Sequence, residues 1–546
     1  MRILHFTFLF LLGLHFAVSQ DCLWASQAGG TLYETVISDV VDRNGNTYIG
    51  GIYRSNPFLT NSASFTCLGI NDLFLIKYEP SGNEVWTMRF GGPNEFFYES
   101  LGSMALDTLH SRLLVTGSFN AMLALPDTVL TGSGLTVFLL VMDLEKNILW
   151  ARAAGGNGED QGLGIAYDDQ GNVYISGINQ EEATFQQTTI PRGGFLAKYS
   201  LNGDLLWAKN KFRFADYNYS EADPFNLCFA NNSLYVNGDV VKETIIIDTI
   251  TLILPDGNGA GYIASFSREG NIEWLRAFGY PDGSSGRKIA IDQIGNIYMA
   301  GTMWGPMGIF NDDTLSGVSG GCFLVKYSKQ GDYQWVQGIQ PSGFAKGFGV
   351  EADNEENVYF TGLFMGYAHF GQFVLFSDAS SIDTMDIFLA RYSKEGGCIG
   401  VKHYSRGRFS TVAVDHTGNV YLGGSFLNSI NIGPQPMISR GGYDAFIAKC
   451  SPITCIEYPG EYKQTALLIY ANPNTGQCRV TVPEEFRREK ELALYVYDHT
   501  GRLIQEARLH LADETVEIDI RARAKGLYHA ILSNGEKSYP GKIVFE

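Results

Sequence analysis

Four short stretches recur along the chain and decide its fold: Gly45-Asn46-Thr47-Tyr48, Gly171-Asn172-Val173-Tyr174, Gly295-Asn296-Ile297-Tyr298 and Gly418-Asn419-Val420-Tyr421. Weaker copies are Asn232-Ser233-Leu234-Tyr235 and Asn357-Val358-Tyr359. When Leu114 is taken as the equivalent of the repeat tyrosine in the remaining unit, seven units follow one another at spacings of 60 to 66 residues. A fixed period of this kind is typical of repeat architectures.

A second anchor follows each repeat tyrosine and completes the unit. The pattern Phe-apolar-apolar-Lys/Arg-Tyr (or Cys) occupies residues 74–78, 195–199, 323–327, 388–392 and 446–450. Units two and four carry degenerate versions that end at Met142 and Phe266. Eight residues after the last position of the pattern, five units have a tryptophan, and the turn between them contains glycine in most units, as a hairpin requires. These tryptophans are Trp86, Trp150, Trp207, Trp274 and Trp335, whereas unit six has Gly400 at this position. Each unit therefore predicts four strands, which is the content of a propeller blade.

The repeated residues resemble the SBBP-type β-propeller repeat of secreted bacterial proteins, over roughly residues 20–450. The resemblance implies a seven-bladed β-propeller. It does not imply a reaction, because function resides in sites that are grafted onto a fold.

Composition agrees with a folded β protein. Of the 546 residues, 45% are hydrophobic and 13% aromatic, which is too rich for disorder. The formal net charge of -18 repels phosphate backbones over most of the surface, so we do not expect a nucleic-acid partner. No run of 18 apolar residues that could span a bilayer follows the N-terminal segment.

The N-terminal segment has the features of an export signal. Arg2 precedes an apolar stretch that ends in Ala17-Val18-Ser19, the small-x-small pattern of signal peptidase. We therefore expect residues 1–19 to be a signal peptide. Export makes disulfides possible among the eight cysteines.

The ring is expected to close through its N-terminus. Trp24 precedes any first strand, whereas the seventh unit ends at Cys450 without a convincing fourth strand. By the eight-residue spacing, Cys22 would face Cys450, and a Cys22–Cys450 disulfide is predicted in a propeller of residues 20–450. The alternative is that residues 456–458 form the fourth strand, with Cys455 as the competing disulfide partner.

The period ends after the seventh unit. A linker is expected over residues 451–465, and the short alternating strands of residues 466–546 predict a small C-terminal β-sandwich. The overall fold class is therefore all-β: a seven-bladed β-propeller followed by this sandwich.

The C-terminal segment resembles the type A sorting domain of the type IX secretion system. The motif residues are Asn472, Pro473, Asp498, Gly501, Gly526, Tyr528 and Lys542. The resemblance implies a Bacteroidota-type bacterium, passage through its outer membrane by the type IX machinery, and removal of the tail. The protein would then be released or held at the cell surface.

One repeat position carries the candidate ligand-binding residues. Glu34, Glu99, Asp160 and Glu221 occupy it in the first four units, just before the strand expected to run along the axis. Arg287, Lys346, Arg406 and Arg408 lie nearby in units five to seven. We predict a channel mouth that is acidic on one side and basic on the other. The alternative is that the acids accept hydrogen bonds from backbone amides between blades.

A second repeated carboxylate is expected to have a structural role. Asp42, Asp168, Asp292, Asp353 and Asp415 each stand six residues before a repeat tyrosine, in Asp-x-x-(Gly)-Asn turns. Capping of the turn explains this pattern, although calcium binding is an alternative. No metal or other cofactor is expected, since the nine histidines form no metal-hydrolase motif.

These observations favour a non-enzymatic, secreted or cell-surface platform that binds a glycan or a protein, and we expect no catalytic residues. One alternative is a polysaccharide hydrolase or lyase that uses two of the four carboxylates as acid and base. The other alternative is a structural component of the envelope.

Overall fold

The computed structural model describes most of the chain, and its strands fall into two compact units, one over Cys22–Ile453 and one within Thr454–Glu546. The expected signal peptide 1–19 and most of the expected linker 451–465 lie outside the described residues. The residues described are 22–93, 99–212, 223–240, 244–254, 259–281, 283–305, 307–311, 313–316, 320–339, 341–371, 373–377, 379, 381, 384–453, 467, 469–470, 475–483, 486, 492–498, 503–509, 515–523, 525–533 and 538–545.

The described strands of the first unit include seven antiparallel sheets built on the repeat. Each sheet is given from its innermost strand outward. Sheet 1 is β2 (Glu34–Val41), β3 (Thr47–Tyr53), β6 (Asp72–Tyr78) and β7 (Glu84–Phe90), and sheet 2 is β8 (Ser100–Asp107), β9 (Arg112–Ala124), β10 (Val129–Asp143) and β11 (Ile148–Gly155). Sheet 3 is β12 (Asp160–Tyr167), β13 (Val173–Asn179), β16 (Gly193–Tyr199) and β17 (Leu205–Phe212). Sheets 4 and 5 are β18 (Asp223–Ala230), β19 (Ser233–Val240), β22 (Ala260–Ser267) and β23 (Ile272–Phe278); and β25 (Ser284–Ile291), β26 (Ile297–Met303), β29 (Gly321–Tyr327) and β30 (Tyr333–Ile339). Sheets 6 and 7 are β31 (Ala345–Ala352), β32 (Val358–Phe364), β35 (Asp386–Tyr392) and β36 (Cys398–Tyr404); and β37 (Gly407–Val414), β38 (Val420–Ile430), β39 (Met437–Cys450) and β1 (Cys22–Ala28).

Short hairpins decorate these sheets. β14 (Ala183–Phe185) and β15 (Thr188–Ile190) extend the outer edge of sheet 2, and β20 (Thr244–Ile247) and β21 (Ile250–Ile253) extend that of sheet 3. The other additions are β4 (Phe58–Leu59) with β5 (Ser64–Phe65), β24 (Tyr280–Pro281) with β27 (Met307–Phe310) and β28 (Asp313–Ser316), and β33 (Gly366–Phe370) with β34 (Phe373–Ser377).

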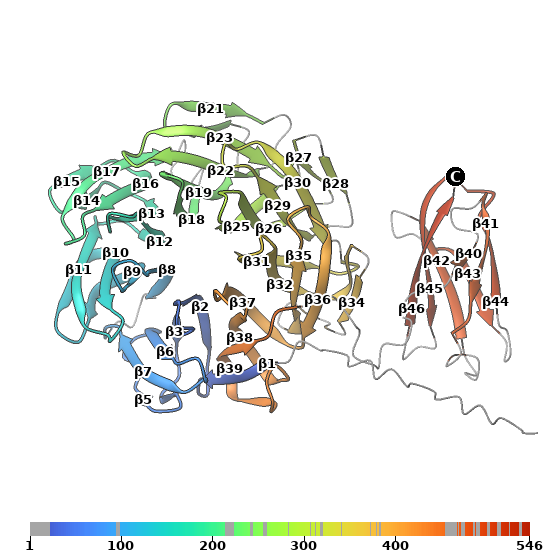
Figure 1. Cartoon of the computed structure of the whole chain (residues 1–546), viewed down its shortest axis with the longest axis horizontal. Helices are drawn as coiled ribbons and strands as arrows, with labels where there is room; N and C mark the ends of the chain where they lie inside the picture. The colour runs from blue at the N-terminus through green and yellow to red at the C-terminus, as the bar shows by residue number, and fades with distance from the viewer. Residues whose placement is uncertain are drawn as a thin grey trace, which may run out of the picture. The chain divides into compact units, whose positions relative to one another are not determined.

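The innermost strands pack against one another in a closed cycle. In order, the contacts run β2, β8, β12, β18, β25, β31, β37 and back to β2. Figure 1 shows the sheets arranged around this central axis. The predicted all-β propeller architecture is therefore confirmed. Each repeat unit of the sequence corresponds to one of the sheets.

The repeated aspartates close the turn between the first two strands of their sheets. The Oδ1 atom of Asp168 accepts hydrogen bonds from the backbone N–H groups of Gln170 (3.0 Å) and Asn172 (2.9 Å), and its Oδ2 atom accepts one from the Tyr174 hydroxyl (3.0 Å). Asp42, Asp292 and Asp415 make the same set of contacts, and Asp353 caps the backbone in the same way. The prediction that these residues cap turns is confirmed.

The tryptophans join neighbouring sheets. The indole N–H of Trp86 donates to the Leu144 carbonyl of sheet 2 (3.2 Å), and that of Trp150 donates to the Leu201 carbonyl of sheet 3 (2.9 Å). Trp335 makes the equivalent bond to Lys394 of sheet 6 (3.0 Å). A positive-φ glycine of the next sheet lies against most of these rings; at Gly203, for example, a Cβ atom would approach the Trp150 ring to 2.6 Å. These turns require glycine for space as well as for conformation.

The N-terminal strand supplies the outer strand of sheet 7. β1 pairs antiparallel with β39, and Cys22 stands opposite Cys450. Trp24 donates to the Pro80 carbonyl of sheet 1 (2.9 Å), so it continues the tryptophan series across the junction of the first and last units. The alternative strand at residues 456–458 lies outside the described residues.

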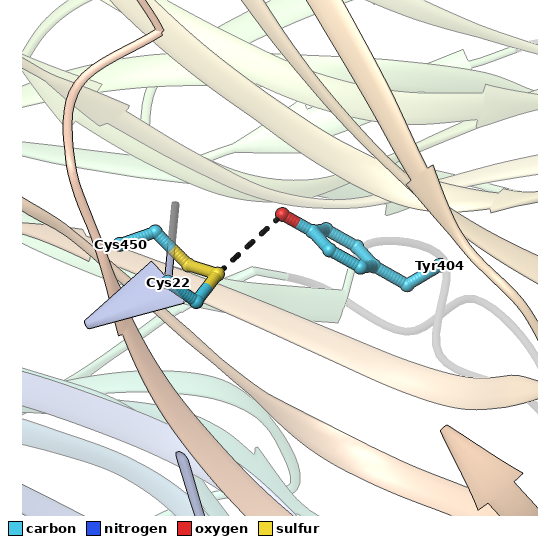
Figure 2. Close-up of a disulfide and its surroundings, with 3 residues drawn as sticks. All are labelled: Cys22, Tyr404 and Cys450. Atoms are coloured by element: carbon cyan, nitrogen blue, oxygen red, sulfur yellow. Dashed lines mark hydrogen bonds between the residues drawn. A yellow bond between two sulfur atoms is a disulfide. The ribbon is translucent and has the colours of Figure 1, made fainter. Parts of the chain in front are cut away.

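A disulfide joins Cys22 to Cys450, as predicted. The bond links positions 428 residues apart, and the Tyr404 hydroxyl lies 3.8 Å from the Cys22 sulfur (Figure 2). Among the described cysteines, Cys67, Cys228, Cys322, Cys398 and Cys478 are free thiols. Cys455, the competing partner, falls outside the described residues.

The C-terminal unit has two sheets. One is β40 (Ile469–Tyr470), β41 (Gln477–Thr481) and β44 (Thr515–Asp519); the other is β43 (Leu503–Leu509), β42 (Leu492–Asp498), β45 (Gly526–Ser533) and β46 (Ser538–Phe545). Val480 and Ile518 of the first sheet share one buried cluster with Leu494 and Leu532 of the second. The unit is therefore a β-sandwich, because each sheet buries one face against the other.

Candidate functional site

The end of the propeller at which the innermost strands begin is called here the entry face. Neighbouring innermost strands are aligned, since the Met104 N–H in β8 donates to the Ser38 hydroxyl at nearly the equivalent position of β2 (3.2 Å). The connections that enter these strands, and those that leave the second strand of each sheet, therefore come together at this end. All of the described candidate residues except Arg287 lie within one position of the start of an innermost strand.

Two of the predicted acids accept hydrogen bonds from nearby backbone N–H groups. Glu34 is buried and accepts hydrogen bonds from the N–H groups of Gly30 (2.8 Å), Ser55 (3.0 Å) and Arg54 (3.3 Å). Asp160 is buried as well and accepts one from Gly156 (2.6 Å). Through Gly30 and Gly156, both side chains hold in place the connection that leads into the innermost strand of their own sheet. Burial raises the pKa of Glu34 and raises that of Asp160 to about 6.

Glu99 and Ser284 occupy the same repeat position. Glu99 is 1% exposed, and burial raises its pKa to about 8, with the negative charge of Asp72 adding to the rise. Ser284 accepts from the Gly261 N–H (2.9 Å) and donates to the Phe278 carbonyl (3.0 Å). A neutral side chain thus also satisfies backbone groups at this position. Glu221 lies outside the described residues.

The basic residues of units five to seven come together instead. We call Arg287, Lys346 and Arg408 the basic cluster; they lie on the adjacent innermost strands β25, β31 and β37. Partial burial lowers the pKa of Lys346, and the positive charges of Arg287 and Arg408 lower it further. Three cations on adjacent strands favour an anionic group on the entry face.

A β-bulge displays one member of this cluster. Gly286 pairs with Gly301 and Lys288 with Ala300, so Arg287 is left out of the ladder. Its side chain is exposed. A bulge typically re-aims the side chain of the extra residue, which explains how Arg287 joins Lys346 and Arg408 although it stands two positions further along its strand.

Aromatic rings flank the cluster on both sides. The Arg408 guanidinium lies 5.3 Å from the ring centres of both Tyr33 and Tyr443, and these two rings are 5.8 Å apart. Lys346 lies 5.8 Å from the Trp304 ring and 5.6 Å from the Phe344 ring. Trp304 is 45% exposed, so its ring is open to a ligand. Cation–π contacts hold the basic side chains in place beside these rings.

Arg406 has a separate role in the described structure. It stands in the turn before β37 with a positive φ of 65°, and its backbone N–H donates to Asp386 (2.9 Å). Its side chain is exposed. The positive charges that act on Lys346 are those of Arg287 and Arg408, so we define the basic cluster without Arg406.

A second group of charges lies deeper along the innermost strands. Burial raises the pKa of Asp39 to about 6 and that of Glu351 to about 7, and the charge of Lys288 lowers both. Asp39 and Glu351 are not among the residues predicted from the sequence; they stand five and six positions into β2 and β31 by the repeat count. Their polar side chains on strands predicted to line the axis were the available signal.

Within the part of the chain that the structure describes, no group of three or more histidine, cysteine, aspartate or glutamate residues is placed to hold a metal ion. A search of the same residues finds no helix with the length and apolar character needed to cross a membrane.

The C-terminal sandwich carries several of the motif residues. Gly526 begins β45 with a φ of 150°, Tyr528 is buried, and Asp498 pairs with Tyr528 across β42 and β45. Lys542 lies on β46 opposite His529. Asn472, Pro473 and Gly501 fall outside the described residues.

Residues 468–546 match the secretion system C-terminal sorting domain. This sorting domain belongs to the type IX secretion system, and it directs the protein to the cell surface or the extracellular space. The match covers the sandwich, so the C-terminal unit carries the export signal.

Other similarities are distant. An uncharacterized WD repeat-containing protein of Acanthamoeba polyphaga mimivirus is 25% identical over 34% of this chain. The matched region makes up 16% of that protein, so the chain spans about a sixth of its length.

Two solved structures resemble the fold. The endosialidase of phage phi92 is 11% identical, with a TM-score of 0.37 over 85% of this chain and 75% of the other. An apocarotenoid oxygenase of Synechocystis is 10% identical, with a TM-score of 0.36 over 80% of this chain and 94% of the other. These likenesses concern the fold and say nothing of a ligand or a reaction for this chain.

Proposed function

We propose that the protein is a seven-bladed propeller exported by the type IX system, which binds an acidic extracellular polysaccharide on its entry face without cleaving it. The observation that carries this proposal is the basic cluster of Arg287, Lys346 and Arg408 on three adjacent innermost strands. The sorting domain supports the extracellular setting.

The chemistry of the flanking residues favours a saccharide over other anions. A guanidinium binds a carboxylate in a bidentate manner, whereas an ammonium acts as a point charge. Trp304, which is exposed, supplies a broad apolar face next to Lys346 that is suited to the C–H face of a sugar ring. Because the chain carries a net charge of -18, the attraction is local to the cluster and selects a carboxylate seated there.

The buried acids give little support to the alternative of a hydrolase or lyase. An acid–base pair has to reach the scissile bond, with its carboxyl groups at a workable separation. Glu34 accepts one hydrogen bond from Gly30 in the connection before β2 and two from Arg54 and Ser55 in the connection after β3, and Asp160 accepts one from Gly156. These carboxylates serve the loops of the fold, and the binding role therefore rests on the basic cluster.

Retention of polysaccharides by the immobilised full chain tests this proposal. We expect polygalacturonate to be retained, to be released as salt rises, and to be recovered without new reducing ends. Loss of retention in Lys346→Gln/Arg408→Gln, with retention kept in Lys329→Gln, would locate the site, because Lys329 is exposed in a turn away from the innermost strands. The proposal fails if the wild-type chain retains no polygalacturonate, if the double variant retains it fully, or if it is cleaved. Retention of an acidic protein in place of the polysaccharide would identify a different class of ligand.

A further inference from the structure

A pocket of about 660 Å³ lies away from the basic cluster, over sheets 2 and 3. Its walls come from three segments: the β9–β10 hairpin, the connection between β11 and β12, and the connection that follows β13. The polar side chains that line it are Asn120, Asn157, Glu159, Gln180, Glu181 and Arg192. A cavity of this size lies within the range of sites for small ligands.

The walls of the pocket are held by specific contacts. Leu135 of the hairpin forms a parallel bridge with Glu159, and the Ser133 hydroxyl donates to the Gly156 carbonyl (2.8 Å). The Gln180 amide donates to the Glu159 carboxylate (3.4 Å), which joins the second wall to the third. These bonds keep the cavity formed before any ligand arrives, and this lowers the entropic cost of binding.

Two further residues explain why the segments can approach so closely. Asn179 is fully buried, and its amide donates to the carbonyls of Glu181 (2.5 Å) and Pro191 (2.9 Å), so both ends of the third wall are fixed. A Cβ atom at Gly134 would meet the Gly158 carbonyl at 2.5 Å. Only glycine allows the hairpin to lie this near to the neighbouring connection.

The charge of the pocket differs from that of the basic cluster. Its lining contains two carboxylates, Glu159 and Glu181, and one guanidinium, Arg192, so acidic ligands are disfavoured. The amides of Asn120, Asn157 and Gln180 present both donors and acceptors. Planar amides and carboxylates match the paired hydroxyls of a sugar, and Leu135 adds an apolar side chain to the lining.

We infer that the pocket over sheets 2 and 3 is a second binding site, which takes a neutral saccharide. This site is independent of the one proposed at the basic cluster. Carboxylates and amides on its walls accept hydrogen bonds from sugar hydroxyls, and the amides also donate to them. The net negative charge of the pocket disfavours the binding of uronic acids.

Neighbouring glutamates offer a matched pair of variants. Glu181 lines the pocket and Glu182 does not, although both are exposed carboxylates of the same connection. The full chain is titrated calorimetrically with neutral oligosaccharides, namely xylohexaose, cellohexaose, mannohexaose and maltohexaose. We expect at least one to bind, and we expect Glu181→Ala and Asn157→Ala each to weaken that binding by about fivefold or more through the loss of hydrogen bonds. Glu182→Ala should bind as the wild type does.

The two proposed sites can fail separately. Lys346→Gln/Arg408→Gln should leave neutral oligosaccharide binding unchanged, and Glu181→Ala should leave polygalacturonate retention unchanged. The inference is overturned if none of the four oligosaccharides binds, if Glu181→Ala binds as tightly as Glu182→Ala, or if neutral binding disappears in the Lys346→Gln/Arg408→Gln variant.

Discussion

The guanidinium of Arg408 lies over the ring of Tyr33, with 5.3 Å between Cζ and the ring centre. The two residues are 375 positions apart in the sequence (408 - 33) and belong to the last and first units of the ring. Arg408 therefore takes its position from ring closure, and the geometry of the proposed ligand site depends on the junction between sheets 7 and 1.

Removal of the Tyr33 ring tests the dependence of the site on this contact. Tyr33→Leu loses the π face that orients Arg408, a contact worth about 0.5–2 kcal/mol. We expect polygalacturonate affinity, measured by calorimetry, to fall by about threefold to tenfold. Tyr33→Phe keeps the ring and should bind nearly as the wild type does; equal losses in the two variants would show that the hydroxyl, and not the ring, positions Arg408.

The Cys22–Cys450 disulfide should dominate the stability of the junction. In the chain-entropy model a loop of this length contributes on the order of 5 kcal/mol. Reduction, or the double variant Cys22→Ser/Cys450→Ser, should therefore lower the midpoint of thermal unfolding by several degrees in calorimetry. A reductant should have no further effect on the double variant. An unchanged midpoint in that variant would mean that β1 pairing alone closes the ring.

Trp24 should act like the other tryptophans of the series. Trp24→Phe removes the hydrogen bond to Pro80 and part of a packed ring, so we expect a loss of about 1–3 kcal/mol in the free energy of unfolding. Trp335→Phe removes the equivalent bond to Lys394 and should cost a similar amount. Denaturant titration of both variants gives the comparison. A much smaller cost at Trp24 would indicate that the junction does not need this contact.

Glu99 should make stability depend on pH. Because burial raises its pKa in the folded protein to about 8, the folded state holds this proton more tightly than the unfolded state. The contribution to stability is complete below the unfolded value near 4.5 and is lost as pH rises through 8. Glu99→Gln removes this loss, so the variant should gain about 1–3 kcal/mol over the wild type between pH 5 and pH 8.

Thermal unfolding of wild type and Glu99→Gln at pH 5 and pH 8 measures that gain. Glu182→Gln, at an exposed position, should show the same difference from wild type at both pH values. If Glu99→Gln also shifts stability equally at pH 5 and pH 8, Glu99 is ionised in the folded protein at both.

Much of the fold could be predicted because the same residue types recur at the same spacing in several units. The spacing from Tyr78 to Trp86 recurs in other units, and the same spacing placed Cys22 opposite Cys450. The aspartate turns were predictable for a related reason, since Asp168 and its partners Gln170 and Asn172 are close in sequence.

The candidate site could be predicted only in part. The repeat placed Glu34 and Lys346 correctly near the start of innermost strands, but it could not say which way each side chain turns. Glu34 turns to the amides of Gly30 and Ser55. Of the partners of the basic cluster, Tyr443 lies in β39 ahead of its repeated residues and Trp304 lies on the connection after β26. Neither belongs to the repeat pattern, and their approach depends on how separate sheets meet around the axis.

Calorimetric titration with a galacturonate oligomer tests the central claim most directly. It compares the full wild-type chain with Arg287→Gln/Lys346→Gln/Arg408→Gln and with the exposed control Lys329→Gln. We expect the wild type and the control to bind equally, with an affinity that falls as salt rises, and the triple variant to lose at least about tenfold in affinity while its unfolding midpoint is retained. Equal binding by the triple variant, or no binding by the wild type at low salt, would contradict the account.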